Sequence, residues 1–159
     1  MTIDLALYQP DFAHNTGILI RLCACMGLRL HVIHPAAFAI TPQALARGGL
    51  DYVEHAIIHQ HASFSVFDDW RRSEGRRLVL MTIKSSQSAY AATFAKGDII
   101  MLGRESAGVP DSVAEVADLR LRIPMSPGLR SINVAMAGSM VVGEAMRQLS
   151  AFPTDITAT

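Results

Sequence analysis

Three segments of the sequence combine polar side chains with glycine or proline. The first reads N-T-G at residues 15–17 and is followed by Arg21. The second, residues 103–110, reads G-R-E-S-A-G-V-P, and the third, residues 123–133, reads I-P-M-S-P-G-L-R-S-I-N. Glycine and proline impose unusual backbone paths, so such segments can hold polar groups in fixed places. The three segments are therefore candidates for a binding or catalytic site.

The chemistry that these segments offer is polar and not of a standard nucleotide-binding kind. Arg104, Glu105 and Ser106 lie between two glycines, directly after a predicted strand. Residues 123–133 offer backbone N–H and C=O groups that can bind the edge of a purine without a charged partner. No G-x-G-x-x-G or P-loop pattern is present, which argues against a standard dinucleotide or nucleoside triphosphate site.

Each segment taken alone also has an ordinary structural interpretation. The first matches a helix N-cap, with Asn15 or Thr16 as the capping residue, followed by a surface arginine. The second matches a tight loop between a strand and a helix. The third matches a rigid connection in which Ser131 or Asn133 caps the final helix. Both interpretations stay open for each segment on this evidence.

The sequence predicts no metal site. Cys23 and Cys25 point to different sides of a predicted helix, because residues two apart do not share a helix face, and we expect both to be reduced, buried thiols. His55 and His59 have i,i+4 spacing, but their segment lacks a helical pattern and has no cysteine nearby.

Strands alternate with helices along the chain, which predicts an α/β domain with a mainly parallel sheet. Ligands bind outside the carboxyl ends of the strands in such sheets, where all three segments fall. The predicted strands cover residues 3–8, 30–33, 56–58, 77–83, 98–102 and 119–123. The predicted helices cover about residues 15–26, 41–48, 63–74, 110–116 and 131–149.

Size and charge narrow the possibilities further. The 159 residues suit one domain, which we place at residues 3–150, followed by a loose tail at residues 151–159. The formal net charge is zero, so any contact with nucleic acid must come from a local patch or from assembled subunits. We see no signal-peptide pattern and no apolar run that could span a bilayer, and we expect a soluble cytoplasmic protein.

The last predicted helix is rich in small residues. Gly138 and Gly143 lie inside it, where glycine costs about 1 kcal/mol of helix stability relative to alanine. We therefore expect a neighbouring segment, a partner subunit, or both to pack very close to the backbone of this helix.

The three segments occur together, in this order and near these separations, in one family. Through N-T-G-x-x-x-R, G-R-E-S-A-G-V-P and I-P-M-x-P-x-x-R-S-x-N, and through G-L-D-Y at residues 49–52, the chain resembles the SPOUT RNA methyltransferases. The closest resemblance is to the TrmL-type tRNA ribose methyltransferases, and it covers about residues 3–149.

This resemblance implies a fold, a cofactor and an assembly. The fold would be an α/β sheet flanked by helices, with a C-terminal deep trefoil knot that departs from the usual unknotted topology. The cofactor would be S-adenosyl-L-methionine, contacted by Met81, Gly103, Ile123 and Ser131, and no metal would be needed. The protein would be a homodimer packed through its first and last helices.

The resemblance also implies a reaction. A methyl group would pass to the ribose 2′-hydroxyl of the wobble pyrimidine, a cytidine or 5-modified uridine, in the anticodon loop of tRNA, with no role for DNA or membranes. The implied catalytic residues are Asn15, Arg21, Glu105, Ser131 and Asn133. Because a guanidinium barely deprotonates in proteins, we expect Arg21 to hold a phosphate and polarise the hydroxyl, with Glu105 orienting Arg21.

Alternatives remain for the target and for the activity itself. The chain could be a SPOUT 2′-O-methyltransferase for another tRNA position or for ribosomal RNA, a non-catalytic RNA-binding module with this fold, or an unrelated α/β nucleotide-binding enzyme. The densest basic cluster is a candidate tRNA contact or a solvated helix end, and it consists of Arg71, Arg72, Arg76 and Arg77.

Overall fold

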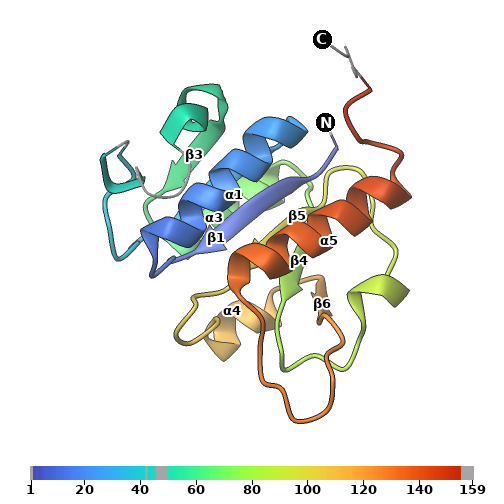
Figure 1. Cartoon of the computed structure of the whole chain (residues 1–159). Coiled ribbons are helices and arrows are strands. Elements are labelled where there is room, and N and C mark those ends of the chain that lie inside the picture. Colours follow the sequence, from blue (N-terminus) through green and yellow to red (C-terminus); the bar gives the residue numbers. More distant parts are fainter. Residues whose placement is uncertain (1, 42, 46–49, 155–159) are drawn as a thin grey trace.

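A six-stranded, fully parallel sheet forms the centre of the protein (Figure 1). The computed structural model describes residues 2–41, 43–45 and 50–154. The strands are β1 (Asp4–Tyr8), β2 (Arg29–Ile33), β3 (Ile57–His61), β4 (Leu78–Met81), β5 (Ile99–Leu102) and β6 (Leu119–Leu121). Their order in the sheet is β3-β2-β1-β5-β4-β6. All carboxyl ends therefore lie at one edge, where the segments that follow β1, β5 and β6 come together.

The central strands are apolar on both faces, which is typical of a buried parallel sheet. Because successive side chains of a strand point to opposite faces, β1 contributes to two cores. Leu5 and Leu7 face one hydrophobic core, and Ala6 and Tyr8 face the other. A strand with strict polar alternation would not fit this position.

Helices cover both faces of the sheet. They are α1 (Ala13–Met26), α3 (Phe64–Ser73), α4 (Asp111–Glu115) and α5 (Val134–Gln148), with short 3₁₀ helices at Leu50–His55 and Ala89–Ala91. α1 and α5 lie side by side over the first core, whereas α3 and α4 contribute to the second (Figure 1). Within the described residues, no helix is long and apolar enough to cross a membrane.

The predicted elements are largely confirmed. All six predicted strands are present, with ends that differ by no more than three residues. Ser63 caps α3 by accepting a hydrogen bond from the Val66 N–H, and Gly27 ends α1 with a φ of 66°. Of the helix expected near residues 41–48, residues 43–45 are helical and the others lie mostly outside the described residues, as do residues 155–159 of the expected tail.

The predicted cap of the first helix is wrong. α1 begins at Ala13, and the N-cap position belongs to Phe12, whose side chain makes no capping hydrogen bond. Asn15 and Thr16 lie buried inside the first turn. The side-chain oxygen of Asn15, which a cap would use, instead accepts a hydrogen bond from Asn133 Nδ2 at 3.0 Å.

The two cysteines lie on different sides of α1, but only Cys23 is buried. Cys25 is exposed, so the prediction that both thiols are buried is wrong. Burial raises the pKa of the Cys23 thiol to about 12, which keeps it protonated at neutral pH.

Close packing against the last helix is confirmed at Gly138 and not at Gly143. A Cβ atom at Gly138 would lie 2.8 Å from side-chain atoms of both Leu102 and Leu19, so α5 approaches β5 and α1 very closely there. A Cβ atom at Gly143 would meet nothing within 4 Å. Within this single chain, Gly143 faces open space.

The segment between β4 and β5 contacts two later parts of the chain. The Arg122 N–H donates to the Gln87 carbonyl at 2.8 Å, just after β6. At the end of α5, Gln148 Nε2 donates to the Ala92 carbonyl at 3.0 Å. The C-terminal part of the chain thus runs alongside residues 82–98 on its way to α5 and beyond. The trefoil knot that the resemblance implies stays a prediction.

The predicted cluster of four arginines is only partly exposed. Arg71 and Arg76 are buried, and all four residues form ion pairs within the chain. The pairs are Arg71 with Asp68 and Asp118, Arg72 with Asp68, Arg76 with Asp4, and Arg77 with Asp98. Aspartates compensate the charge of the predicted basic cluster: Asp68 is nearby in sequence, whereas Asp4, Asp98 and Asp118 are distant.

A buried carboxylate and two histidines form a second polar network. Asp4 accepts hydrogen bonds from Arg29, Arg76 and from His31 Nε2 at 3.1 Å. His31 Nδ1 lies 3.0 Å from His61 Nε2, and since His31 already donates through Nε2, His61 is the donor of this bond. Burial, together with the neighbouring histidines, lowers the pKa of His61 to about 4, and burial also lowers that of His31.

We expect mild acid to destabilise the protein through this network. Both histidines have lowered pKa values when folded, so the unfolded chain binds more protons below pH 6.5, and stability is lost as the pH falls from about 6.5 towards 4. Allowing for the partial exposure of His61, the free energy of unfolding should drop by about 1–2 kcal/mol between pH 7.5 and 4.5.

Urea titrations at several pH values measure this drop. His61→Gln, which keeps an N–H donor for His31, should show a clearly smaller drop. The matched variant His55→Gln, at an exposed position, should behave like the wild type. An equal drop in all three proteins would contradict the assignment to His61.

Candidate functional site

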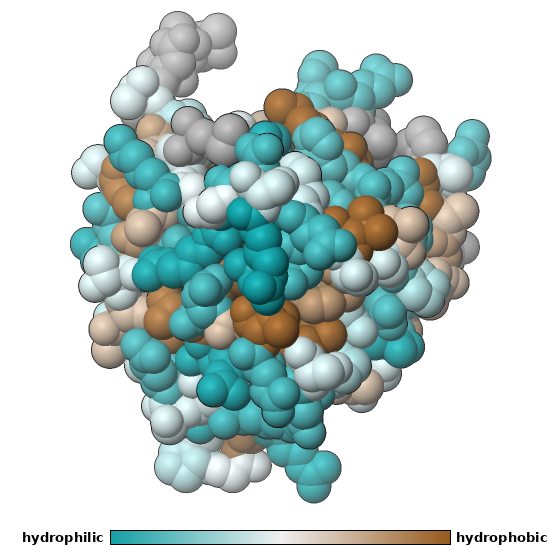
Figure 2. All heavy atoms as spheres, turned by 180° about the vertical axis from the view of Figure 1, so that it is seen from behind, coloured by the Kyte–Doolittle hydropathy of each residue, from teal (hydrophilic) through white to brown (hydrophobic). Residues whose placement is uncertain are grey.

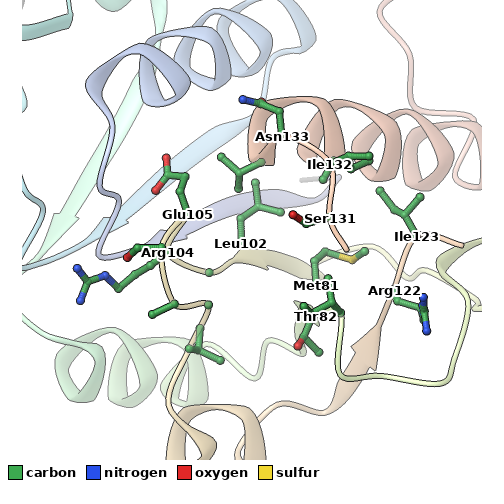
Figure 3. A pocket seen from close by; sticks show the side chains of 18 of the residues that line it. Met81, Thr82, Leu102, Arg104, Glu105, Arg122, Ile123, Ser131, Ile132 and Asn133 are labelled. Carbon is green, nitrogen blue, oxygen red and sulfur yellow. The ribbon is translucent and has the colours of Figure 1, made fainter. Parts of the chain in front are cut away.

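A cavity of about 660 Å³ opens at the carboxyl ends of the central strands (Figure 3). Its lining comes from the start of α1, the end of β4, the loop after β5, and the segment that joins β6 to α5. All three polar segments that were singled out in the sequence contribute to it. The parallel sheet thus brings them to one place, as its topology predicts.

Most of the predicted site residues line this cavity. The positions predicted to contact the cofactor are all present, namely Met81, Gly103, Ile123 and Ser131. Four of the predicted catalytic residues are also in the lining, namely Asn15, Glu105, Ser131 and Asn133. Figure 3 shows Glu105, Ser131 and Asn133 at the cavity. Their proximity is observed, and their roles stay predictions.

A chain of hydrogen bonds joins the three segments beside the cavity. Glu105 Oε1 accepts from Asn15 Nδ2 at 3.2 Å, and Asn15 Oδ1 accepts from Asn133 Nδ2 at 3.0 Å. Asn133 Oδ1 in turn caps α5 by accepting from the N–H groups of Ala135 and Met136 at 2.8 and 3.2 Å. Because each group orients the next, the carboxylate and both carboxamides are held relative to the helix end.

Apolar side chains form much of the remaining wall. Met81, Leu102 and Ile123 line the cavity from the end of β4, the end of β5 and the segment that follows β6 (Figure 3). Ser131 is exposed and lies near the N-terminal end of α5. Apolar walls with a few convergent polar groups are typical of sites for small organic ligands.

The loop after β5 is closed tightly on itself. Arg104 and Gly108 exchange two backbone hydrogen bonds of 2.9 Å. A Cβ atom at Gly103 would lie 2.8 Å from the backbone of Gly108, and Gly108 has a φ of 65°. Both positions require glycine for these steric reasons, and the closure presents Glu105 and its neighbours at the cavity.

Asp11 fastens this loop to the start of α1. Its Oδ1 accepts from Arg104 Nη2 at 2.7 Å, and its Oδ2 accepts from the N–H and hydroxyl of Ser106 at 2.9 and 2.6 Å. Its own N–H donates to Glu105 Oε2 at 2.8 Å. Hydrogen bonds from Arg104 and Ser106 lower the pKa of Asp11 to about 2, so it is charged at neutral pH.

The sequence patterns did not identify Asp11 as a site residue. Its only signal was its place in the turn that follows β1, at the carboxyl end of a strand. Its partners lie more than 90 positions away in the sequence, so the pairing becomes visible only in the fold.

Arg21 is not placed with the other predicted catalytic residues. It is exposed on α1, where its guanidinium lies 4.4 Å from the ring centre of Tyr52. Residues six apart on a helix point in clearly different directions, so Arg21 faces away from Asn15. Within the single chain, Glu105 is bonded to Asp11 and Asn15 and Arg21 contacts Tyr52, so the role of Glu105 in orienting Arg21 stays a prediction.

The donor set of the cavity suits an organic ligand. Its polar lining comprises the carboxylate of Glu105, the carboxamides of Asn15 and Asn133, the hydroxyls of Thr82, Ser106 and Ser131, and the cationic groups of Lys84, Arg104 and Arg122. In the part of the chain that the structure describes, no group of three or more His, Cys, Asp or Glu residues is arranged to bind a metal ion.

Comparison with known proteins gives consistent matches along the chain. The family described as SpoU rRNA Methylase matches residues 2–143. The tRNA (cytidine(34)-2'-O)-methyltransferase of Ancylobacter novellus is 51% identical over 152 residues, which are 96% of each chain. The protein of the same name from Escherichia coli strain K12 is 40% identical over 149 residues, which are 92% of this chain and 94% of that one.

Solved structures match in fold as well. One, described as giving structural insights into the 2-OH methylation of C/U34 on tRNA, has a TM-score of 0.88 and 36% identity, covering 94% of this chain and 97% of that chain. The SpoU methyltransferase AviRb from Streptomyces viridochromogenes, in complex with the cofactor AdoMet, shares the fold with a TM-score of 0.82 at 23% identity. The match covers 94% of this chain and 61% of that one.

We expect Asp11→Ala to loosen the loop after β5. The substitution removes the acceptor of the Ser106 N–H, so the amide protons of residues 104–108 should exchange with deuterium about tenfold faster, equivalent to about 1.4 kcal/mol of lost protection. Hydrogen–deuterium exchange by NMR measures this. Asp111→Ala is the matched control, because its ion pair with Lys84 is fully exposed and contributes little. Unchanged exchange in Asp11→Ala would contradict the fastening role.

Proposed function

The chain belongs to the SpoU rRNA methylase family and has the SPOUT fold, and from this premise we propose that it is a tRNA 2′-O-methyltransferase. Its target is the wobble pyrimidine of the anticodon loop, cytidine 34 or a 5-modified uridine at that position. Relatives named for methylation of cytidine 34 align with nearly the whole chain, which supports this target over ribosomal RNA.

One observation carries the assignment to this chain's own residues. The hydrogen-bonded chain of Glu105, Asn15 and Asn133 lies beside the cavity whose walls hold the predicted cofactor positions. Donor and acceptor of a methyl group must meet in one place, and this arrangement offers oriented polar groups next to a cavity of about 660 Å³.

S-adenosyl-L-methionine suits the cavity by its chemistry. Its flat, largely apolar adenine fits between side chains such as Met81, Leu102 and Ile123, and backbone groups of residues 123–131 are available to the purine edge. When bound, the cofactor supplies a methyl group on a positively charged sulfur.

The residues of the chain contribute mainly by positioning. Transfer in line requires the acceptor oxygen to be held behind the methyl carbon, and such alignment provides a large part of the rate of a two-substrate reaction. The carboxamides of Asn15 and Asn133 are held by their own hydrogen bonds and can orient the ribose without first reorganising. Ser131 lines the same cavity and its hydroxyl can serve as a further polar contact.

For Arg21 we propose phosphate binding outside the cavity of its own subunit. Its guanidinium is exposed and held over the ring of Tyr52, which limits its motion. A permanently charged planar fork of N–H donors suits the RNA backbone and cannot take up a proton from the ribose.

We further propose that two copies associate through α1 and α5. Met136 and Met140 are 60% and 42% exposed, and with Gly143 they form an apolar stripe along α5 at i, i+4 and i+7 spacing. The open space at Gly143 lets a second helix approach its backbone. The opposite side of the molecule is largely hydrophilic, with only small separate apolar areas (Figure 2).

Transfer of labelled methyl from S-adenosyl-L-methionine to bulk tRNA from a strain that lacks this gene tests the function. Nucleoside mass spectrometry should identify a 2′-O-methylpyrimidine that maps to the wobble position. Glu105→Gln should lower turnover by about 100-fold because it removes the charge of the hydrogen-bonded chain, while cofactor affinity changes by only a few-fold. Label found only in ribosomal RNA would contradict the target, and no transfer to any RNA would contradict the reaction.

Met140→Glu should convert a dimer into a monomer, because it introduces a charge into the apolar stripe of α5. Light scattering after size-exclusion chromatography measures the mass. Val66→Glu is the matched control, since Val66 is also an exposed apolar residue but lies on α3. A monomeric wild type, or a dimeric Met140→Glu, would contradict this assembly.

A further inference from the structure

Phe12 is an exposed aromatic residue at the mouth of the cavity. Its side chain is 57% exposed and lines the same cavity as Asn15, three positions later. It is the only aromatic residue among the described residues that line the cavity. Exposure of an apolar phenyl ring to water costs free energy. We therefore ask whether the bound substrate covers this ring.

The position of Phe12 also works against the local structure. Phe12 occupies the N-cap of α1, where Ser, Thr, Asp or Asn would bond to a free backbone N–H, and it forms no such bond. The other long helices of this protein have these caps, Ser63 for α3 and Asn133 for α5. A residue that breaks a local preference next to a site is expected to serve that site.

The geometry of the substrate supplies the partner for this ring. A ribose that enters the cavity to reach the hydrogen-bonded chain of Asn15 brings its base with it, and the base is joined directly to the sugar. Drawing the nucleotide out of the anticodon loop breaks its stacking on its neighbours. Stacking on an aromatic side chain replaces the lost contact, as is common where proteins bind single-stranded RNA.

We propose that Phe12 binds the base of the nucleotide to be methylated by stacking on it; this rests on the proposed function of the site. The phenyl face carries no hydrogen-bonding group, so it accepts cytosine and uracil alike. Phe12 thus provides affinity for a pyrimidine without choosing between the two. Selection of the position falls to other contacts with the anticodon loop.

The test measures methyl transfer to an anticodon stem-loop RNA. Phe12→Leu keeps an apolar side chain but removes the aromatic face, and kcat/KM for the RNA should fall about tenfold, mainly through KM. Phe12→Tyr keeps the face and should stay within about twofold of the wild type. Phe152→Leu is the matched control, because Phe152 is 47% exposed and does not line the cavity. Cofactor affinity and the mass of the assembly should not change in any variant.

A second substrate separates stacking from an indirect effect. It is the same stem-loop with a wobble nucleotide that keeps its ribose and 2′-hydroxyl but lacks its base. On this RNA, kcat/KM of the wild type should be about tenfold lower than on the intact stem-loop. Phe12→Leu should lower kcat/KM by no more than about twofold further, because removing the base and removing the ring abolish the same contact.

Two outcomes overturn the inference alone. If the losses of kcat/KM from Phe12→Leu and from removal of the base multiplied, Phe12 would act without contacting the base. If Phe12→Leu became monomeric, Phe12 would belong to the subunit interface. A wild-type protein that methylates neither the intact stem-loop nor tRNA would overturn the proposed function, and the inference with it.

Discussion

The carboxylate of Asp11 holds together the parts on which the site depends. It binds Arg104 and Ser106 of the loop after β5, while its backbone N–H binds Glu105 of the same loop. Glu105 is thereby placed against Asn15, and through Asn15 against the cap of α5. A single charged group in the turn after β1 thus fixes the relative positions of three segments that are far apart in the sequence.

This arrangement is possible because of the order of the strands. β1 lies directly beside β5, and β4 lies beside both β5 and β6, so the segments that follow them end at one edge of the sheet. Glycines let the loop after β5 fold back on itself without a clash, and Gly138 lets α5 pack against β5 and α1. Because the core behind the cavity is closely packed, the backbone that carries the polar groups of the site is held in place.

Several charged side chains are paired inside the protein, among them Asp4, Arg71, Arg76 and Asp98. Arginines that are adjacent in sequence are compensated by aspartates from β1, β5 and the segments around α3 and β6. With a formal net charge of zero, the chain must rely on specific contacts for much of its binding to RNA. The guanidinium of Arg21 and the ring of Phe12 are the contacts of that kind that we propose.

The sequence by itself determined the α/β class, the positions of all six strands and the three segments that form the cavity. Period and composition report on local structure, and parallel strands place the segments that follow them at one edge. The motif similarity also identified the family, because several spaced residues in order are specific where each motif alone is not.

Only the tertiary structure decided which polar side chains bind one another. Asn15 resembled a helix cap, and Arg71 and Arg76 part of a basic surface, yet each has partners that are distant in sequence or lie on another face. Asp11 and Phe12 were not predicted as site residues, because their surroundings in the fold are likewise not visible in the local sequence. A hydrogen bond or an exposed ring depends on what the fold brings near it, and local patterns contain no information about that.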